Sequence, residues 1–143
     1  MEQTEEKLFR VEKELPFLDP LISEWFNNKY DGLSDPQRKA IPLIHSGKSV
    51  LVSSPTGTGK TLSAFLAVLN ELFIQSRTGE IKDSVFCLYI SPLKALANDI
   101  DRNLKEPLRE IDELAISRGN DFPKIRVGVR SGDTSQSERQ KTQ

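Results

Sequence analysis

The sequence has one cysteine, one histidine and no excess of either charge, and each shortage excludes a class of protein. A single thiol, Cys87, cannot form an internal disulfide or supply a cysteine zinc site. Lys and Arg number 20 and Asp and Glu number 21, so the net charge of −1 creates no basic field for nucleic acid or an anionic membrane. The longest apolar runs are six residues, far short of the roughly 20 that cross a bilayer. Polyanion binding must therefore depend on local groups.

The 143 residues are enough for one domain of ordinary size. Apolar residues make up 36% of the chain, too many for a chain that is disordered throughout. Residues 1–6 are acidic, which is the wrong charge for a signal peptide. Together these features predict a soluble, cytoplasmic protein without a membrane partner.

Helical patterns fill the N-terminal third of the chain. Apolar residues recur at helical spacing over residues 8–15. A second helix is expected to begin at Asp19, an acceptor side chain followed by proline at the first helical position, and a third at Ser34. Gly47 is the expected end of the third helix, and Pro42 inside it is expected to kink or shorten it.

Three short apolar runs predict strands at residues 49–53, 85–90 and 125–129, and the first two are expected to be buried. Helical patterns separate these runs, the longest from Lys60 to about Gln75. Strands that alternate with helices of this length predict an α/β fold with a mostly parallel sheet. Because a typical sheet has more than three strands, we expect this one to be incomplete at the C-terminal end.

The pattern divides the chain into three parts. Helices occupy residues 1–46, and the α/β core follows over residues 47–130. Within this core, two further helices are predicted over residues 94–104 and 107–116. Residues 131–143 contain no apolar side chain, so we expect a mobile polar tail that forms no core element.

A glycine-rich sequence lies between the first predicted strand and the next helix, and it reads Ser54-Pro-Thr-Gly-Thr-Gly-Lys-Thr61. Its glycines allow successive backbone N–H groups to point at phosphate oxygens, and the following helix adds the positive end of its dipole. The lysine supplies a mobile charge, and the last threonine supplies a hydroxyl ligand for Mg²⁺. The alternative is a plain glycine-rich turn. The motif predicts six nucleotide-binding residues: Thr56, Gly57, Thr58, Gly59, Lys60 and Thr61. Lys60 and Thr61 are also predicted to be catalytic, and Thr61 is the predicted magnesium ligand.

This motif, with a small residue in place of its first glycine, resembles motif I of the superfamily 2 helicases. Ser34-Asp-Pro-Gln37 resembles the Q motif of that family, and Ile90-Ser-Pro-Leu-Lys-Ala-Leu-Ala97 resembles its motif Ia. Residues 126–134 resemble the segment before motif Ib in Lhr-type (large helicase-related) proteins. The amino-acid sequences of the last two stretches favour the Lhr type over the DEAD-box type. The resemblance covers about residues 17–140.

The resemblance implies a three-layer RecA-like P-loop NTPase lobe that binds ATP and Mg²⁺. In the intact protein it implies an ATP-dependent helicase or translocase acting on nucleic acid, with DNA favoured over RNA. The family's motif II, an Asp-Glu pair, should follow Arg139, and the second lobe should carry the arginine fingers. We therefore expect the given sequence to be the N-terminal part of the first lobe. The rest of the helicase chain is then its expected protein partner. Alone it should bind nucleotide but hydrolyse it poorly, because groups that stabilise the transition state are missing.

Gln37 has two interpretations. In the Q motif, its amide would hydrogen-bond the adenine edge with one donor and one acceptor. Ser34 and Gln37 also have the spacing of a helix capping box. The position of Gln37, 23 residues before Lys60, favours the adenine interpretation. Four aromatic residues could stack on the base: Phe17, Trp25, Tyr30 and Phe26. Trp25 and Phe26 have the spacing of a packed helix face, which favours the core for them, whereas Phe17 and Tyr30 lie off that face.

Backbone contacts to nucleic acid are expected at the carboxyl ends of the second and third predicted strands, where ligands bind in an open parallel sheet. Backbone N–H groups at a helix start, together with a lysine, could hold a phosphate there without reading sequence. The alternatives are a solvated lysine at a helix start and a solvated sheet edge. The predicted residues are Pro92, Leu93, Lys94, Arg130, Gly132 and Thr134.

Two other classes of protein stay open on the sequence alone. A small P-loop kinase or nucleotide-dependent regulator would have an activity that added nucleic acid does not change. A non-enzymatic nucleic-acid-binding module would bind without ATP and without Lys60, although the balanced charge argues against it.

Overall fold

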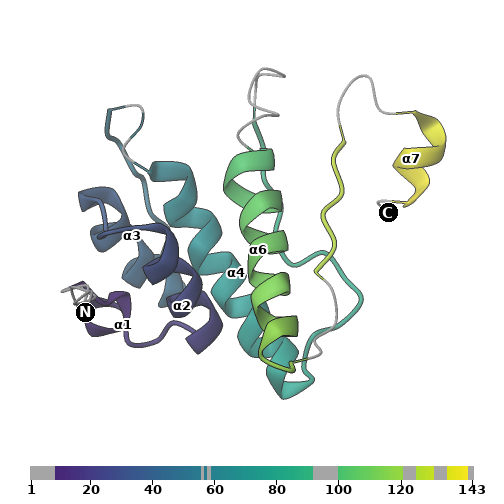
Figure 1. The fold of residues 1–143 in the computed structure, drawn as a ribbon. Coiled ribbons are helices and arrows are strands. Elements are labelled where there is room, and N and C mark those ends of the chain that lie inside the picture. The colour runs from purple at the N-terminus through teal and green to yellow at the C-terminus, as the bar shows by residue number, and fades with distance from the viewer. Residues whose placement is uncertain are drawn as a thin grey trace.

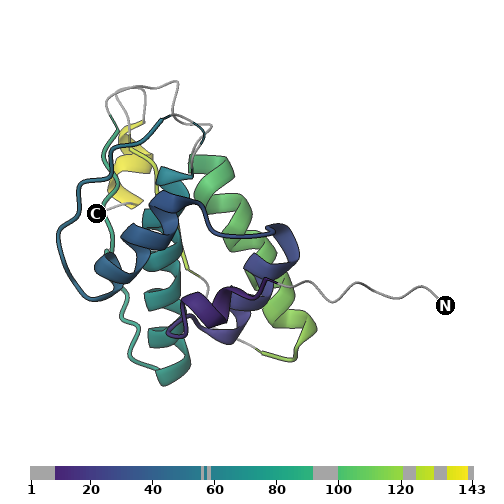
Figure 2. The same cartoon turned by 90° about the vertical axis from the view of Figure 1, so that its left-hand side faces the viewer.

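The computed structural model describes residues 9–55, 57, 59–91, 100–120, 125–130 and 135–141. Its regular elements are α1 (Val11–Glu14), α2 (Pro20–Lys29), α3 (Asp35–His45), α4 (Lys60–Thr78), the π-helix η2 (Asp101–Lys105), α6 (Glu106–Ser117) and α7 (Gln136–Lys141). In Figure 1, α4 lies between the group α1–α3 and helix α6. Figure 2 shows α3 crossing α4, with which it is in direct contact.

Helices α2 and α3 begin and end at the predicted signals, whereas of the helical pattern at residues 8–15 the described residues form only the short helix α1. Asp19 caps α2, because its carboxylate accepts a hydrogen bond from the N–H of Leu21. A capping box between Ser34 and Gln37 begins α3. Pro42 does not shorten α3, which continues to His45, and Gly47 follows in the left-handed region with a φ of 79°.

The core forms where the apolar faces of α2, α4 and α6 meet. On α4, Leu62, Leu66, Leu69 and Phe73 recur at helical spacing and are all buried. Phe26 of α2 is fully buried in the same cluster. Because α4 begins directly after the glycine-rich loop, this packing also holds the loop in place.

A polar network joins the start of α2 to α4. The side chain of Asp19 is only 1% exposed and accepts hydrogen bonds from Arg77 Nε at 2.5 Å and Nη2 at 3.0 Å. The backbone N–H of Asp19 donates to Asn70 Oδ1 at 2.6 Å, and Asn70 Nδ2 donates to the carbonyl of Phe17 at 3.4 Å. These contacts hold the start of α2 against α4 through residues that are 51 to 58 positions apart in sequence.

The three predicted strands are not formed in the described part of the chain, where no residue belongs to a sheet. Residues 49–53, 85–90 and 125–129 run without regular structure, and Figure 1 draws no arrow there. The prediction that the first two are buried is wrong, since Leu51 is 94% and Leu88 77% exposed. Cys87, which lies in the second of these segments, is exposed as well. An extended segment needs a neighbour in register to pair its backbone, and none of the described segments provides one. A parallel sheet in three layers is therefore not confirmed.

A π-helical turn precedes α6. The predicted helix over residues 94–104 falls largely on residues 92–99, which lie outside the described part, but its end appears as η2. Pro107, in the first turn of α6, has no N–H to donate to the carbonyl four residues earlier. The widened turn lies where that helical hydrogen bond cannot form, which explains its position.

The polar tail contains one short helix, α7, whose residues at 136 and 137 are exposed. This placement agrees with the prediction that the tail supplies no core element, whereas its mobility stays a prediction. Among the described residues, no helix combines the length and the apolar character that crossing a membrane requires.

Candidate nucleotide-binding site

The glycine-rich loop has left-handed backbone at both described glycines. Gly57 has a φ of 85° and Gly59 a φ of 79°, a region that side chains other than glycine rarely adopt. Gly59 is the residue directly before α4, so the loop turns straight into the helix. Thr56 and Thr58, also predicted to bind nucleotide, lie outside the described residues.

The N-terminus of α4 is open to an anion. No side chain caps it, and no acidic residue lies in its first turn. The first helical backbone bond runs from the N–H of Ser63 to the carbonyl of Gly59 at 3.1 Å. The N–H groups of residues 60–62 therefore precede the helical ladder and lie at the positive end of the helix dipole. An anion placed there would accept these hydrogen bonds.

Lys60 folds back across the loop. Its Nζ donates a hydrogen bond to the carbonyl oxygen of Ser54 at 2.5 Å, and its side chain is half-buried. The ammonium group is thus held between the start and the end of the loop, where a phosphate oxygen could replace the carbonyl. Sequence reasoning missed this contact, because a motif gives the residue types but not the conformation of the loop.

Thr61 is half-buried in the first turn of α4, next to the predicted phosphate position. Its hydroxyl fits a Mg²⁺ ion that is otherwise held by phosphate oxygens and water. Within the described part of the chain, no group of three His, Cys, Asp or Glu residues could form a metal site by itself. A magnesium ion here would therefore depend on the nucleotide for its other ligands.

Gln37 lies against the glycine-rich loop. Its Oε1 accepts the N–H of Ser34 at 2.9 Å, and its own N–H donates to Ser34 Oγ at 3.4 Å, so the capping box is confirmed. Gln37 is 5% exposed. A Cβ built on Gly59 would lie 2.5 Å from Gln37 Nε2 and 3.4 Å from Ser34 Oγ. Gly59 is thus favoured by its positive φ, and a side chain at this position would displace the Gln37 amide.

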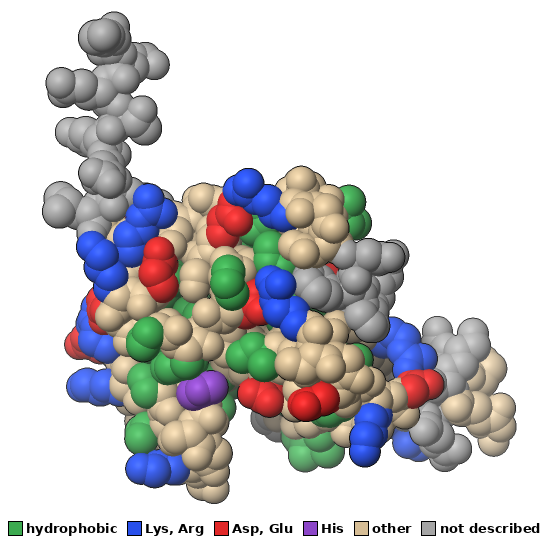
Figure 3. Space-filling view, turned by 90° about the horizontal axis from the view of Figure 1, so that it is seen from below, with side chains coloured by type: hydrophobic (Ala, Val, Ile, Leu, Met, Phe, Trp, Pro, Cys, Tyr) green, Lys and Arg blue, Asp and Glu red, His purple; other side chains and the backbone are tan. Residues whose placement is uncertain are grey.

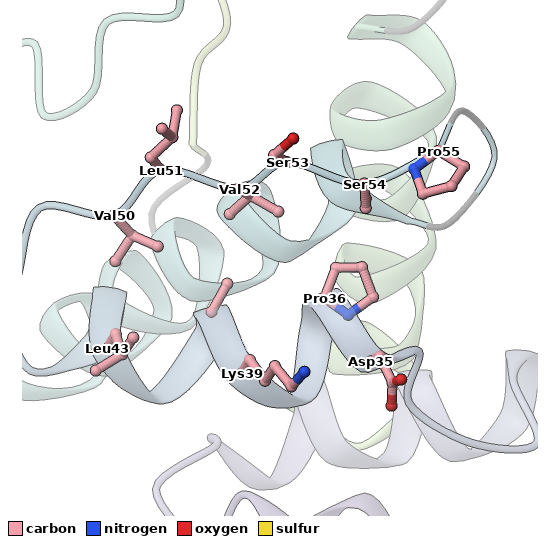
Figure 4. Close-up of a pocket in the computed structure, with 11 residues that line it drawn as sticks. Asp35, Pro36, Lys39, Leu43, Val50, Leu51, Val52, Ser53, Ser54 and Pro55 are labelled. Carbon is pink, nitrogen blue, oxygen red and sulfur yellow. The ribbon is translucent and has the colours of Figure 1, made fainter.

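A groove of about 460 Å³ borders the loop, between α3 and residues 50–55. In Figure 4, Val50, Val52 and Ser54 point toward α3, whereas Leu51 and Ser53 point away. Its lining is mostly apolar, with Lys39 and Asp35 as the charged residues. The alternation is that of a β-strand, although the described residues provide no sheet hydrogen bonds for it.

The four aromatic candidates occupy different environments. Trp25 and Phe26 are buried in the core, as their spacing predicted. The Tyr30 ring packs against both, with centroids 5.9 Å from Trp25 and 4.8 Å from Phe26. The Phe17 ring stacks on His45, with centroids 4.0 Å apart and planes 5° apart.

Most of the predicted nucleic-acid contacts, Pro92, Leu93, Lys94, Gly132 and Thr134, lie outside the described residues. Arg130 is exposed at the end of residues 125–130. Nearby Arg126 forms an ion pair with Asp83, and both side chains are exposed. Figure 3 shows one face of the molecule, on which the coloured Lys and Arg side chains alternate with Asp and Glu instead of forming one basic patch.

Comparison with known proteins gives consistent relatives. A family model described as DEAD/DEAH box helicase matches residues 34–142. The chain is 51% identical over 140 residues to "ATP-dependent helicase Lhr-Core protein 2" of Thermococcus barophilus, covering 98% of this chain and 16% of that protein. It is 50% identical over 139 residues to "ATP-dependent helicase Lhr-Core" of Methanothermobacter thermautotrophicus, covering 97% and 16%.

A solved structure is also similar. It is described as Mycobacterium smegmatis helicase Lhr bound to ssDNA and AMP-PNP, with a TM-score of 0.74 and 40% sequence identity. The match covers 90% of this chain and 16% of that one. The chain thus spans about one sixth of the length of the relatives that it matches.

Proposed function

Since the chain belongs to the DEAD/DEAH box helicase family, we propose that it is the ATP-binding part of an ATP-dependent nucleic-acid helicase. The observation that carries the proposal is the uncapped start of α4 behind Gly59, with Lys60 turned into the loop. Backbone N–H groups and one lysine are the donors that a row of phosphates requires.

Phosphate binding would exchange partners of Lys60. In the structure, its ammonium group donates a hydrogen bond to the Ser54 carbonyl. A β- or γ-phosphate oxygen carries more negative charge than a carbonyl, so the ammonium would move to it and the loop would open around the nucleotide. The Thr61 hydroxyl would complete the shell of the Mg²⁺ ion, which supplies charge neutralisation when it is bound.

The base would lie beside Gln37, whose amide borders the loop at Gly59. One amide presents both an acceptor and a donor, which matches the N6 and N7 positions of adenine. Arg130, with Pro92, Leu93, Lys94, Gly132 and Thr134, would contact the nucleic-acid backbone. DNA is favoured because a relative 40% identical is described with ssDNA bound.

The extended segments would become strands of a RecA-like sheet only in a longer chain. Support comes from the match to the solved Lhr helicase structure, which has a TM-score of 0.74 and of which this chain covers 16%. With the sheet unformed, the chain alone would bind nucleotide but hydrolyse it slowly, since catalysis needs further groups that orient water and stabilise charge.

The direct test is equilibrium binding of a fluorescent ADP with Mg²⁺. We expect Lys60→Ala to weaken binding about tenfold or more, which is the effect of losing one charged hydrogen bond. Lys48→Ala removes the same charge from an exposed position outside the loop and should bind like the wild type. Thermal melts of both variants check that the fold is retained. Equal affinity of the Lys60 and Lys48 variants would refute the phosphate assignment.

Adding single-stranded DNA to the ADP-bound chain separates the remaining classes. A helicase segment should bind DNA with an affinity that Arg130→Ala lowers, whereas a kinase or regulator should not respond to DNA at all. Binding that is unchanged by Lys60→Ala and by removal of nucleotide would favour a simple nucleic-acid-binding module.

A further inference from the structure

The six residues from Val85 to Ile90 form an apolar run that is exposed on both faces. Every residue of the run is exposed, with Val85 at 75%, Leu88 at 77% and Ile90 at 81%. Alternate residues of an extended segment point to opposite faces, so neither face of this run is covered. In each of the other two extended segments, alternate residues are half-buried, so one face of each lies against the molecule. The run at residues 85–90 is therefore the most accessible of the three.

The backbone of this run has no partner among the described residues. No backbone hydrogen bond joins residues 85–90 to another residue of the described part of the chain. The run is nevertheless anchored to the helical part of the molecule, because the Tyr89 ring packs against Phe65 of α4 with centroids 5.2 Å apart. An anchored, extended segment with unpaired N–H and C=O groups is a template for a strand from another molecule.

The sequence of the run suits pairing with a copy of itself. It reads Val-Phe-Cys-Leu-Tyr-Ile, without a charge, a proline or a glycine, and four of the six residues are β-branched or aromatic. In two antiparallel strands related by a two-fold axis, one residue lies opposite its own counterpart, because opposite residues share a face. Pairing centred on Cys87 or on Leu88 places apolar residues opposite apolar ones. The net charge of −1 gives little repulsion between two copies.

We propose that residues 85–90 are a self-association surface, to which a second copy of this chain adds the same residues as an antiparallel strand. The ion pair between Arg126 and Asp83 keeps residues 125–130 on one side of the run, so a copy would use the opposite edge. Two strands that pair by one edge each close into a dimer and leave no further edge to extend. The surface is separate from the nucleotide site. In a longer chain that supplies strands of its own, those strands would compete with the copy for this edge.

The test measures the mass of the 143-residue chain by analytical ultracentrifugation over a concentration series. We expect the wild type to pass from monomer toward dimer between about 10 and 500 µM, because one pair of strands is smaller than a standard interface. Leu88→Lys places like charges close together across the two-fold axis and should raise the dissociation constant about tenfold or more. Leu51→Lys is the matched control, because it makes the same change at a residue 94% exposed in another extended segment. It should dimerise like the wild type.

Each other outcome overturns the proposal. A wild type that stays monomeric over the whole series has no such surface. An equal loss of association in the Leu88 and Leu51 variants would assign it to general apolar contact, and no loss in either would place the contact elsewhere. Mass that grows beyond the dimer would refute the closed two-fold pair. Circular dichroism of both variants checks that the helices are retained.

A probe on Cys87 locates the contact without a change at Leu88. Cys87 is the only cysteine and is exposed, so a nitroxide reagent labels one position. Whether Cys87 or Leu88 lies on the axis, the two Cys87 Cα atoms of a dimer would be within about 10 Å, one strand across and at most two residues along. The spectrum should broaden as the dimer forms and sharpen when unlabelled chain replaces most of the labelled chain at constant total concentration. A labelled chain that dimerises with a sharp spectrum would refute the proposal.

Discussion

The helical body of the molecule, α1 to α4 with α6, differs sharply from its extended segments at residues 49–55, 85–91 and 125–130. In the helical body, apolar side chains are buried at helical spacing and side-chain caps begin α2 and α3. In the extended segments, large apolar side chains such as Leu51, Leu88 and Ile90 are exposed. Apolar content does not explain the difference, because both regions are rich in aliphatic side chains.

Backbone hydrogen bonding explains it. A helix pairs its N–H and C=O groups within its own segment, so it needs only one apolar surface to pack against. A strand pairs these groups with another segment, and its side chains become buried only when a sheet exists. The helical body is thus complete within the described residues, whereas each extended segment depends on neighbours that these residues do not provide.

The largest expected effect comes from truncating a core side chain of the helical body. Phe26→Ala should lower the free energy of unfolding by about 3–5 kcal/mol, because it removes a fully buried ring and leaves a cavity among α2, α4 and α6. Leu88→Ala, in an extended segment, should change it by less than about 0.5 kcal/mol. Urea unfolding followed by circular dichroism measures both. A comparable loss in both variants would mean that the extended segments are as well packed as the helices.

A smaller effect is expected in the loop that joins the two regions. Gly57→Ala and Gly59→Ala both force a side chain into the left-handed region, at a cost of about 1 kcal/mol each. Only at Gly59 does the added Cβ also meet the Gln37 amide, whereas nothing lies within 4 Å at Gly57. Gly59→Ala should therefore lose about 1–2 kcal/mol more, since Gln37 must leave its cap. Equal unfolding midpoints for the two variants would refute the close approach of Gln37.

Local sequence signals predicted the helical body well. Asp19 before proline, the spacing of Ser34 and Gln37, and the glycine at 47 each specify a helix end through hydrogen bonds within a few residues. The resemblance to Lhr-type helicases is confirmed by the family match and by relatives about 50% identical. The nucleotide-binding roles assigned to Gly57, Gly59, Lys60 and Thr61 stay predictions.

Contacts between distant segments could not be predicted. The ion pair of Asp19 with Arg77 joins residues 58 apart, and the approach of Gln37 to Gly59 depends on how α3 packs on α4. Strand burial failed for the same reason, since an apolar run shows that a segment can be buried but not that a partner is present to bury it. A capping box and an adenine contact also require the same residue types, so residues 34–37 alone do not decide between them, and only the distance in sequence to Lys60 favours the adenine contact.

The smallest expected effect on the free energy of unfolding comes from breaking single ion pairs, one in the helical body and one at the extended segments. In the helical body, Glu110 of α6 accepts hydrogen bonds from Trp25 Nε1 at 2.6 Å and from Lys29 Nζ at 3.0 Å. Burial alone raises the pKa of Glu110, but these hydrogen bonds outweigh it and hold the pKa below its ordinary value of 4.5. A carboxylate with a lowered pKa stabilises the fold above about pH 4.5, and this contribution is lost as the pH falls through the folded-state pKa.

Glu110→Gln should therefore lower the free energy of unfolding by about 1 kcal/mol at pH 7, and the difference from the wild type should shrink toward pH 3. Asp83→Asn breaks the ion pair that Arg126 of the extended segments forms with Asp83, just before residues 85–91. Both side chains are exposed, so this change should leave the unfolding midpoint unchanged at pH 7. Urea titrations of the wild type and both variants at pH 7, and of the Glu110 variant at pH 3, measure these differences. A pH-independent effect of Glu110→Gln would mean that the carboxylate charge contributes nothing to joining α2 and α6. An effect of Asp83→Asn as large as that of Glu110→Gln would mean that the extended segments are held in place by contacts as strong as those of the helical body.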